Sequence, residues 1–156
     1  MKAVTDRTTG FHVRDYRQGD FEKVSLLWIE TGMGHPARGD DEDTILATIR
    51  QGGRLLLLEE EKTKTICGSS WLTTDGRRVF IHYFGILPAF QGKKLSHLLM
   101  ERSLACVKET GLQVKLEVHN TNLKAINLYK KYGFEYLGDY DVYIIRDLSK
   151  IKSFPE

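Results

Sequence analysis

Residues 114–134 have the sequence VKLEVHNTNLKAINLYKKYGF, in which one strand, one turn and one helix follow each other within about twenty residues. Residues 114–119 predict the strand, and the Asn-containing turn after them leads into a predicted helix at 122–132. Gly133 follows the last helical residue, where glycine commonly ends a helix. This stretch therefore predicts a β-α unit with a defined end, which is typical of an α/β fold.

Working outward from this unit, changes in hydrophobic period predict the other elements. The helix predicted at 20–31 has Asp20 as its N-cap, and a loop at 32–39 with three Gly and a Pro separates it from the next helix. The predicted order is β-α-α-β-β-β-α-β-α-β-β, an α/β single-domain mixed central sheet flanked by helices. The remaining elements are strands at 11–14, 54–60, 65–73, 79–87, 134–137 and 142–146, and helices at 41–51 and 91–109.

The length and composition fit one globular domain. The chain has 156 residues, 41% hydrophobic and 28% charged, and its net charge of +2 indicates no nucleic-acid or membrane partner. We expect a domain at 11–148, with a poorly ordered lead-in at 1–10 and a tail at 149–156. The longest apolar run, Leu55–Leu58, is far too short to span a membrane, and the lead-in has no hydrophobic region of a signal peptide, so a cytoplasmic protein is expected.

The two cysteines, Cys67 and Cys106, both lie among apolar residues and predict small buried side chains. Two cysteines in a chain of this length do not indicate a disulfide framework. Neither has a histidine at metal-ligand spacing, so no metal site is predicted.

The junction ILPAFQGKKLS at 86–96 connects a predicted strand to a predicted helix. A helix N-terminus has unpaired N–H groups and the positive end of the helix dipole, both of which favour a phosphate. Gly92 allows close approach of the backbone, while Lys93 and Lys94 add positive charge and Ser96 is small. An ordinary helix start with two solvated lysines is the alternative that this segment alone leaves open. The spacing of a Walker A loop is absent.

Together the two stretches resemble the GCN5-related N-acetyltransferase (GNAT) family. Residues 91–96 are similar to its Q/R-x-x-G-x-G/A motif, and 116–134 to its L-E-V-x-x-x-N-x-x-A-x-x-L-Y-x-x-x-G-F segment. The predicted order of elements also matches, so the resemblance covers nearly the whole chain. Lys94 replaces the first motif glycine. An ordinary helical conformation tolerates this change, whereas a positive φ makes a lysine costly there.

The resemblance implies acetyl-CoA as a co-substrate, without a metal. The pyrophosphate is expected on the N–H groups of the 91–96 turn, the pantetheine arm along the end of the 79–87 strand, and the thioester carbonyl near the Ile86 N–H. The implied donor-binding residues are Phe84, Ile86, Leu87, Gln91, Gly92, Lys93, Lys94, Leu95, Ser96, Asn122 and Lys131.

The resemblance also implies direct attack of an amine on the thioester. Tyr129 matches the family's general acid, which protonates the leaving thiolate; a core tyrosine on an amphipathic helix is the alternative. For the general base, Glu117 in the L-E-V string is one candidate and His82 is the runner-up, with His119 a weaker third. Each has a purely structural alternative, a strand-surface carboxylate for Glu117 and a half-buried histidine for His82.

The acceptor is expected to bind at three places that the family uses: the loop between the first two helices, the central strand, and the connection between the last two strands. The acceptor itself is expected to be a primary amine of a small molecule or of a protein N-terminus or lysine. The candidate acceptor residues are Trp28, His35, Tyr83, Asp139 and Tyr140.

Three functions are compatible with these patterns. A catalytic N-acetyltransferase fits most of them, an acyl-CoA sensor without turnover would fit the lysine at position 94, and an interaction protein would need a clustered basic patch that the scattered lysines do not form. Dimers are common in the family, which leaves a homodimer as one open assembly state.

Overall fold

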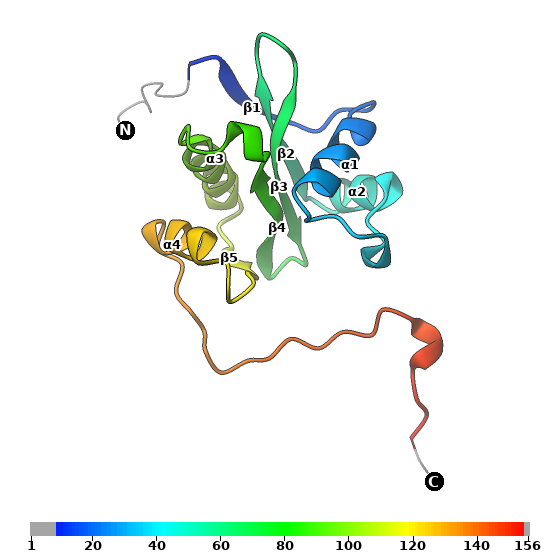
Figure 1. The fold of residues 1–156 in the computed structure, drawn as a ribbon. Helices are drawn as coiled ribbons and strands as arrows, with labels where there is room; N and C mark the ends of the chain where they lie inside the picture. The colour runs from blue at the N-terminus through cyan, green and yellow to red at the C-terminus, as the bar shows by residue number, and fades with distance from the viewer. Residues whose placement is uncertain (1–8, 155–156) are drawn as a thin grey trace. The chain divides into compact units, whose positions relative to one another are not determined.

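The computed structural model of the chain describes residues 9–154 (Figure 1). It divides into two compact units, one up to Glu117 and one from Val118 onward, and each is described by itself. The predicted lead-in at 1–10 lies almost wholly outside the described residues. The boundary between the units falls between the L-E and V of the L-E-V string.

The first unit is built on a five-stranded sheet with the strand order β1-β2-β3-β4-β5. The first three pairings are antiparallel and the β4–β5 pairing is parallel, which confirms the predicted mixed sheet. The strand at the β5 edge ends three residues earlier than predicted. The strands are β1 (Phe11–Asp15), β2 (Arg54–Glu60), β3 (Ile66–Thr74), β4 (Arg78–Ile86) and β5 (Gln113–Leu116).

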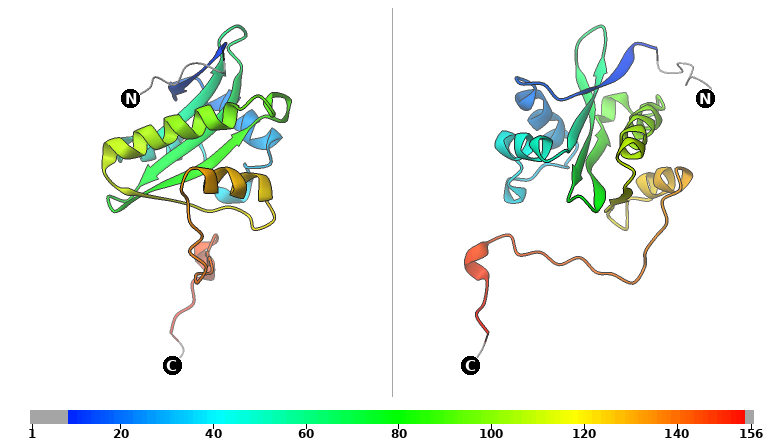
Figure 2. Two further views of the ribbon diagram at one scale, coloured as in Figure 1. Left: turned by 90° about the vertical axis from the view of Figure 1, so that its left-hand side faces the viewer. Right: turned by 180° about the vertical axis from the view of Figure 1, so that it is seen from behind.

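Helices cover both faces of this sheet (Figure 2). Helices α1 (Phe21–Glu30) and α2 (Glu42–Arg50) pack on one face, and α3 (Leu95–Thr110) packs on the other. A 3₁₀ turn, Pro36–Arg38, interrupts the loop between α1 and α2, and a second, Pro88–Phe90, follows β4. The three helices are those predicted, and Gly111 ends α3 with a φ of 68°.

The core explains why β2 has no polar alternation. Leu55, Leu56, Leu57 and Leu58 are all at most 2% exposed, because helices cover both faces of this central strand. Full burial of each such side chain contributes about 1.5–3 kcal/mol. Cys67 is fully buried as predicted, whereas Cys106 is only half-buried and its Sγ accepts a hydrogen bond from Arg54 Nη1 at 3.0 Å.

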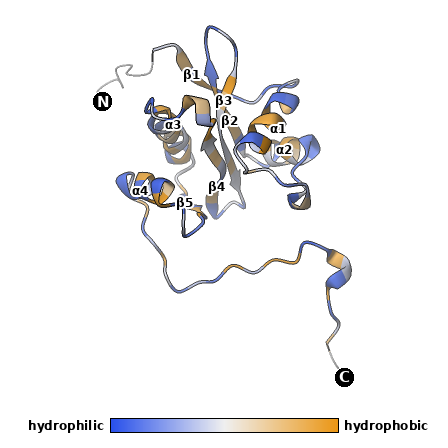
Figure 3. Cartoon of the chain, viewed as in Figure 1, coloured by the Kyte–Doolittle hydropathy of each residue, from blue (hydrophilic) through white to orange (hydrophobic). Residues whose placement is uncertain are grey.

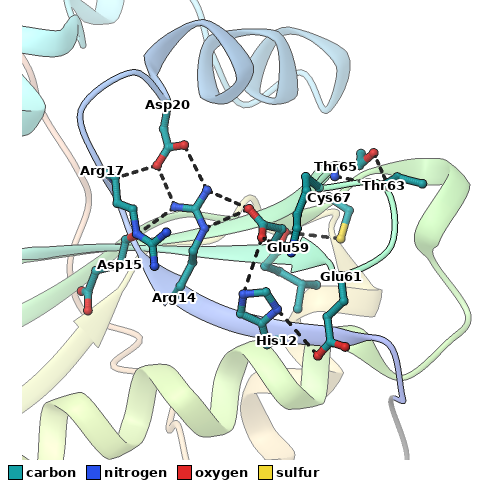
Figure 4. Close-up of polar contacts among 12 residues, drawn as sticks. His12, Arg14, Asp15, Arg17, Asp20, Glu59, Glu61, Thr63, Thr65 and Cys67 are labelled. Carbon is teal, nitrogen blue, oxygen red and sulfur yellow. Dashed lines mark hydrogen bonds and ion pairs between the residues drawn. The ribbon is translucent and has the colours of Figure 1, made fainter.

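Asp20 corrects one prediction about the start of α1. It occupies the N-cap position, but its side chain makes no capping bond. Its carboxylate instead accepts hydrogen bonds from the Arg14 guanidinium and from the Arg17 backbone N–H, both at 2.7 Å (Figure 4). A bidentate guanidinium is a stronger donor to a carboxylate than a helix N–H, so the ion pair with β1 takes precedence over the cap.

The second unit contains α4 (Leu123–Lys131), which begins after Asn122 and ends before Gly133. The strands predicted at 134–137 and 142–146 are wrong, because those residues have irregular backbone. Strand propensity produces a strand only where a neighbouring strand supplies the hydrogen-bond ladder, and among the described residues this segment forms no ladder. Large apolar and aromatic side chains of the segment are consequently exposed: Tyr136, Leu137, Tyr140, Val142, Tyr143, Ile144 and Ile145. Figure 3 colours parts of this irregular segment as hydrophobic.

A short 3₁₀ turn, Leu148–Lys150, follows in the predicted tail. Across the described part of the chain, no helix combines the length and the apolar character that a membrane span requires.

Candidate active site

The two parallel strands β4 and β5 separate halfway along β4. Their last pair of residues is Ile81 and Leu116, yet β4 continues to Ile86. β5 ends at Leu116, so residues 82–86 lie beyond the β4–β5 ladder. This is the stretch on which the sequence placed the pantetheine arm.

A bulge lies at the same point of β4. The register between β3 and β4 shifts between Ser69 and Trp71, and Tyr83 has a φ of +45°. An aromatic residue with positive φ is a genuine outlier, and such residues concentrate at functional sites. The bulge interrupts the alternation of side chains along β4 at His82 and Tyr83. Both rings lie against Trp71, with centroids 6.3 and 5.8 Å from its ring.

Four neighbours hold Tyr83 in this conformation. Its ring stacks on Trp28 with centroids 4.3 Å apart, and the Arg38 guanidinium lies 5.4 Å from the ring centroid. Its hydroxyl donates a hydrogen bond to Asp40, and its carbonyl accepts one from Ser69 Oγ at 2.7 Å. Burial, and then the neighbouring Asp40 carboxylate, raise the pKa of Tyr83 to about 12, so the phenol stays protonated.

A hollow of about 290 Å³ lies beside Tyr83, between α1, the α1–α2 loop and β4. Its aromatic and acidic lining suits an organic cation more than an anion. Three of the predicted acceptor residues, Trp28, His35 and Tyr83, line it. His35 also stabilises the loop, because its Nδ1 accepts a hydrogen bond from the Ala37 N–H at 3.1 Å. The aromatic, acidic and histidine residues that line the hollow are Phe21, Trp28, His35, Asp40, Asp41 and Tyr83.

The imidazole of His82 lies beside Thr73 and two aromatic rings. Its Nε2 lies 2.9 Å from Thr73 Oγ1, and the rings of Phe80 and Trp71 crowd the imidazole although one side of it remains exposed. This crowding lowers the pKa of His82, and the charges of Asp40 and Glu117 only partly oppose the shift. The imidazole is therefore neutral at pH 7. Glu117 is exposed directly after β5, close enough for its charge to act on His82.

The predicted phosphate-binding turn follows β4. The Gln91 side chain is fixed, since its Nε2 donates to the Ile86 carbonyl at 3.1 Å. Gly92 has a φ of 82°, and Lys94 has a φ of 60° in the left-handed region. The helix α3 consequently begins at Leu95, which corrects the predicted start at Gln91, and position 94 is one where glycine would be relaxed and lysine is strained.

The charges around this turn are arranged for an exterior ligand. Lys93, Lys94 and Gln91 are exposed, and Lys93 Nζ lies 5.2 Å from the Phe90 ring centroid. Leu95 is buried and anchors the first turn of α3, while Ser96 is half-buried beside it. The turn thus joins two lysines, a positive-φ glycine and a helix N-terminus, which together favour a polyanion.

The remaining predicted residues belong to the second unit. Tyr129 lies on α4, with its ring 5.8 Å from that of Phe134 in an edge-to-face contact. Asn122 caps α4 by accepting from the Ala125 N–H at 3.2 Å, and Lys131 lies in the last turn of the helix. Asp139 and Tyr140 are exposed on irregular backbone. Their roles toward the β4 residues stay predictions.

Sequence reasoning missed Ser69. It lies on β3, is fully buried, and connects Trp28 to Tyr83 by two hydrogen bonds. A signal was present, because two serines within the otherwise apolar segment ICGSSWL must find partners when buried. Across residues 9–154 no three His, Cys, Asp or Glu side chains are arranged to hold a metal ion.

Comparisons with known proteins agree with this geometry. Residues 20–134, more than half of the chain, match the model of the acetyltransferase (GNAT) family. Acetyltransferase YE1169 from Yersinia enterocolitica is 29% identical over 124 residues, which cover 79% of this chain and 86% of that protein. The chain therefore belongs to the GNAT family and has the fold of an acetyltransferase.

Solved structures share the fold. A GNAT family protein from Streptococcus pneumoniae TIGR4 superposes with a TM-score of 0.68 at 24% identity, covering 88% of this chain and 99% of that one. A GNAT family acetyltransferase from Elizabethkingia anophelis, solved with acetyl-CoA bound, has a TM-score of 0.62 at 18% identity and covers 81% of this chain and 77% of that one. At these identities the likeness concerns the fold alone.

Proposed function

We propose that the protein is an acetyl-CoA-dependent N-acetyltransferase that transfers acetyl directly to a primary amine. The observation that supports this most is the geometry of β4. The strand leaves β5 after Ile81, bulges at Tyr83, and leads within five residues of its end into a turn with two positive-φ residues. Family membership and the acetyl-CoA-bound relative from Elizabethkingia anophelis support the choice of donor.

Donor binding follows from this arrangement. The N–H groups of the 91–96 turn hold the pyrophosphate, with Lys93 and Lys94 adding charge. The pantetheine arm extends along Phe84–Leu87 in place of the missing β5 residues, as a strand would. An N–H near Ile86 donates to the thioester carbonyl and stabilises the negative charge that develops on its oxygen.

The chemical step needs a neutral amine and a protonated leaving group. A protonated amine cannot attack, so His82, neutral at pH 7, accepts its proton directly or through water. The amine nitrogen then bonds to the carbonyl carbon, the C–S bond breaks, and the thiolate takes a proton from the Tyr129 phenol. The nitrogen loses its second proton to water as the amide forms, and the Tyr129 phenolate takes a proton back from water. Glu117 is the other candidate base, because its carboxylate is exposed directly after β5 and its charge acts on His82.

The acceptor amine enters from the hollow beside Tyr83. Trp28, Tyr83 and His35 supply apolar and polar contact, and Asp40 supplies the negative charge that attracts an ammonium group. Asp139 and Tyr140 are proposed as further residues that contact the acceptor.

A thiol-release assay tests the proposal. Purified protein is mixed with acetyl-CoA and a panel of amines: a peptide with a free N-terminus, a lysine peptide, a polyamine, amino acids and an aminoglycoside. We expect amine-dependent release of CoA thiol and acetylated product for at least one class. Acetyl-CoA binding without release from any amine would instead favour an acyl-CoA sensor, the reading that the strained Lys94 supports.

The acid assignment has its own test in the variant Tyr129→Phe. General acid catalysis contributes about 10²–10⁴-fold, so kcat should fall by that factor in a chemistry-limited assay while acetyl-CoA still binds. Wild-type kcat in this variant would remove Tyr129 from the mechanism.

A further inference from the structure

A buried relay connects the core of the first unit to the bulge of β4. Trp28 Nε1 donates to Ser69 Oγ at 3.0 Å, and Ser69 Oγ donates to the Tyr83 carbonyl at 2.7 Å. The direction is determined, since an indole N–H can only donate and leaves the serine hydroxyl its own hydrogen for the carbonyl. Ser69 is 0% exposed and Trp28 is 4% exposed, so water cannot replace either bond.

The Tyr83 carbonyl belongs to the same peptide plane as the Phe84 N–H. In a trans peptide these two groups point in opposite directions, and the plane is rigid. All peptide bonds of the described residues are trans. Fixing the carbonyl toward β3 therefore directs the Phe84 N–H, and the strand that follows it, toward the opening where β5 has ended.

We propose that Ser69 is a positioning residue for acetyl transfer: its hydroxyl holds the Tyr83 bulge and thereby orients the Phe84–Ile86 backbone against the thioester. This inference rests on the proposed function. The positive φ of Tyr83 is strained, and stored strain persists only where the surroundings over-determine it. The stacked Trp28 ring and the Ser69 hydroxyl supply that constraint from the same side of the sheet.

Ser70 is a matched control one residue away. It is also 0% exposed, but it faces the opposite side of the sheet, where its Oγ accepts a hydrogen bond from Ser103 on α3 at 2.8 Å. Ser69→Ala and Ser70→Ala each remove one hydroxyl from the core. A purely structural role for both hydroxyls predicts similar losses of stability and similar activities, whereas a positioning role separates the two variants in activity alone.

The experiment measures kcat, the KM for acetyl-CoA, and unfolding by urea for the wild type and the variants. For Ser69→Ala we expect kcat to fall about 10- to 100-fold, the scale of a misplaced reacting group. Its KM for acetyl-CoA should change by less than about twofold, since the pyrophosphate turn is untouched. Ser70→Ala should keep wild-type kcat, and Ser69→Thr, which retains a hydroxyl, should recover most of the loss. Equal kcat in the two alanine variants would overturn the proposal.

A second measurement separates this inference from the proposed function. In ¹⁵N–¹H spectra, the amides of 84–86 should shift differently with acetyl-CoA than with CoA, and this difference should vanish in Ser69→Ala and persist in Ser70→Ala. An enzyme that releases no thiol but shows this pattern would refute amine acetylation and uphold the positioning role. The absence of any acetyl-dependent shift in the wild type would refute the positioning role.

Discussion

Two clusters of polar side chains in the first unit differ in how completely their charges are paired. At one end of the sheet, Arg14 binds Asp20 and Glu59, whose side chains are 11% and 9% exposed (Figure 4). The second cluster surrounds two residues of β4, Tyr83 and His82. Asp40 accepts a hydrogen bond from the Tyr83 hydroxyl and makes no ion pair among the described residues, while His82 has Thr73 as its hydrogen-bond partner. Both clusters contain carboxylates, yet only one neutralises them internally.

The difference concerns which charges are paired inside the protein. In the first cluster burial acts to raise the pKa of Asp20, but the hydrogen bonds from Arg14 and from the Arg17 N–H outweigh it and lower that pKa. The hydrogen bonds to Asp20 and Glu59 raise the pKa of Arg14. No group there is left for a ligand. In the second cluster the Asp40 carboxylate accepts the Tyr83 hydroxyl and lies beside a hollow, while burial lowers the pKa of the His82 imidazole.

The largest expected effect is on stability, from Arg14→Met. Removing one partner of a buried ion pair leaves uncompensated carboxylates and costs about 3–5 kcal/mol. The measurement is urea unfolding at pH 7, with kcat checked on the folded variant and expected to be near normal. The loss should shrink as pH falls through the lowered pKa of Asp20, since protonation of Asp20 removes the pairing from the wild type as well.

Arg54→Met is the control for this prediction. Arg54 pairs with Asp15, but their side chains are 39% and 56% exposed, so the pair contributes at most about 1 kcal/mol. If the two variants lost equal free energy of unfolding, the buried ion pairs of Arg14 would stabilise the protein no more than the exposed pair of Arg54.

The next effect is on rate, from His82→Gln. Losing a general base costs about 100-fold or more in kcat, while unfolding should change little because the ring is partly exposed. In the wild type the rate should fall as pH drops through the pKa of His82, which lies below 6.5. That acid limb should be missing in His82→Gln. If Glu117→Gln removes it instead, Glu117 is the base.

A smaller effect concerns Lys94, which like Tyr83 has a positive φ but whose side chain is exposed. A left-handed residue costs roughly 1–2 kcal/mol and glycine loses roughly 0.5–1 kcal/mol in flexibility, so Lys94→Gly should stabilise the protein by about 0.5–1 kcal/mol. Urea unfolding measures this gain. Lys94→Ala keeps a Cβ and should therefore show no gain in stability. If Lys94→Gly lowered the free energy of unfolding, the backbone of Lys94 would not be strained.

The smallest effect is a shift of the pH profile, from Asp40→Asn. The Asp40 charge raises the pKa of His82, so its removal should move the acid limb of the rate to lower pH. The rate at pH 8, where the imidazole is neutral either way, isolates any loss of acceptor binding. A shift toward higher pH would mean that His82 does not control the limb.

Much of the fold could be predicted because local pattern and tertiary pairing agree in it. The strand Arg54–Glu60 was placed at its observed limits, since an uninterrupted apolar run leaves little choice. The strands predicted at 134–137 and 142–146 are absent from the structure. Alternating apolar residues indicate strand propensity, but they do not show whether a neighbouring strand is present to pair with.

Some features of the candidate site could likewise be predicted from the sequence, and others could not. The turn at 91–96 could be predicted from its residue types. The left-handed conformation of Lys94 could not, because lysine has no preference for a positive φ that the sequence would show. Ser69 was missed because its role depends on a register shift between β3 and β4, which is a long-range property of the sheet.

The buried and half-buried cysteines affect how transfer can be measured. Burial raises the pKa of Cys67 to about 12, and it also raises the pKa of Cys106, against the opposing charge of Arg54. Thiol reagents attack the thiolate, so neither side chain should react appreciably at neutral pH. Colour that develops with such a reagent therefore counts CoA released by the enzyme, with almost no background from the protein itself.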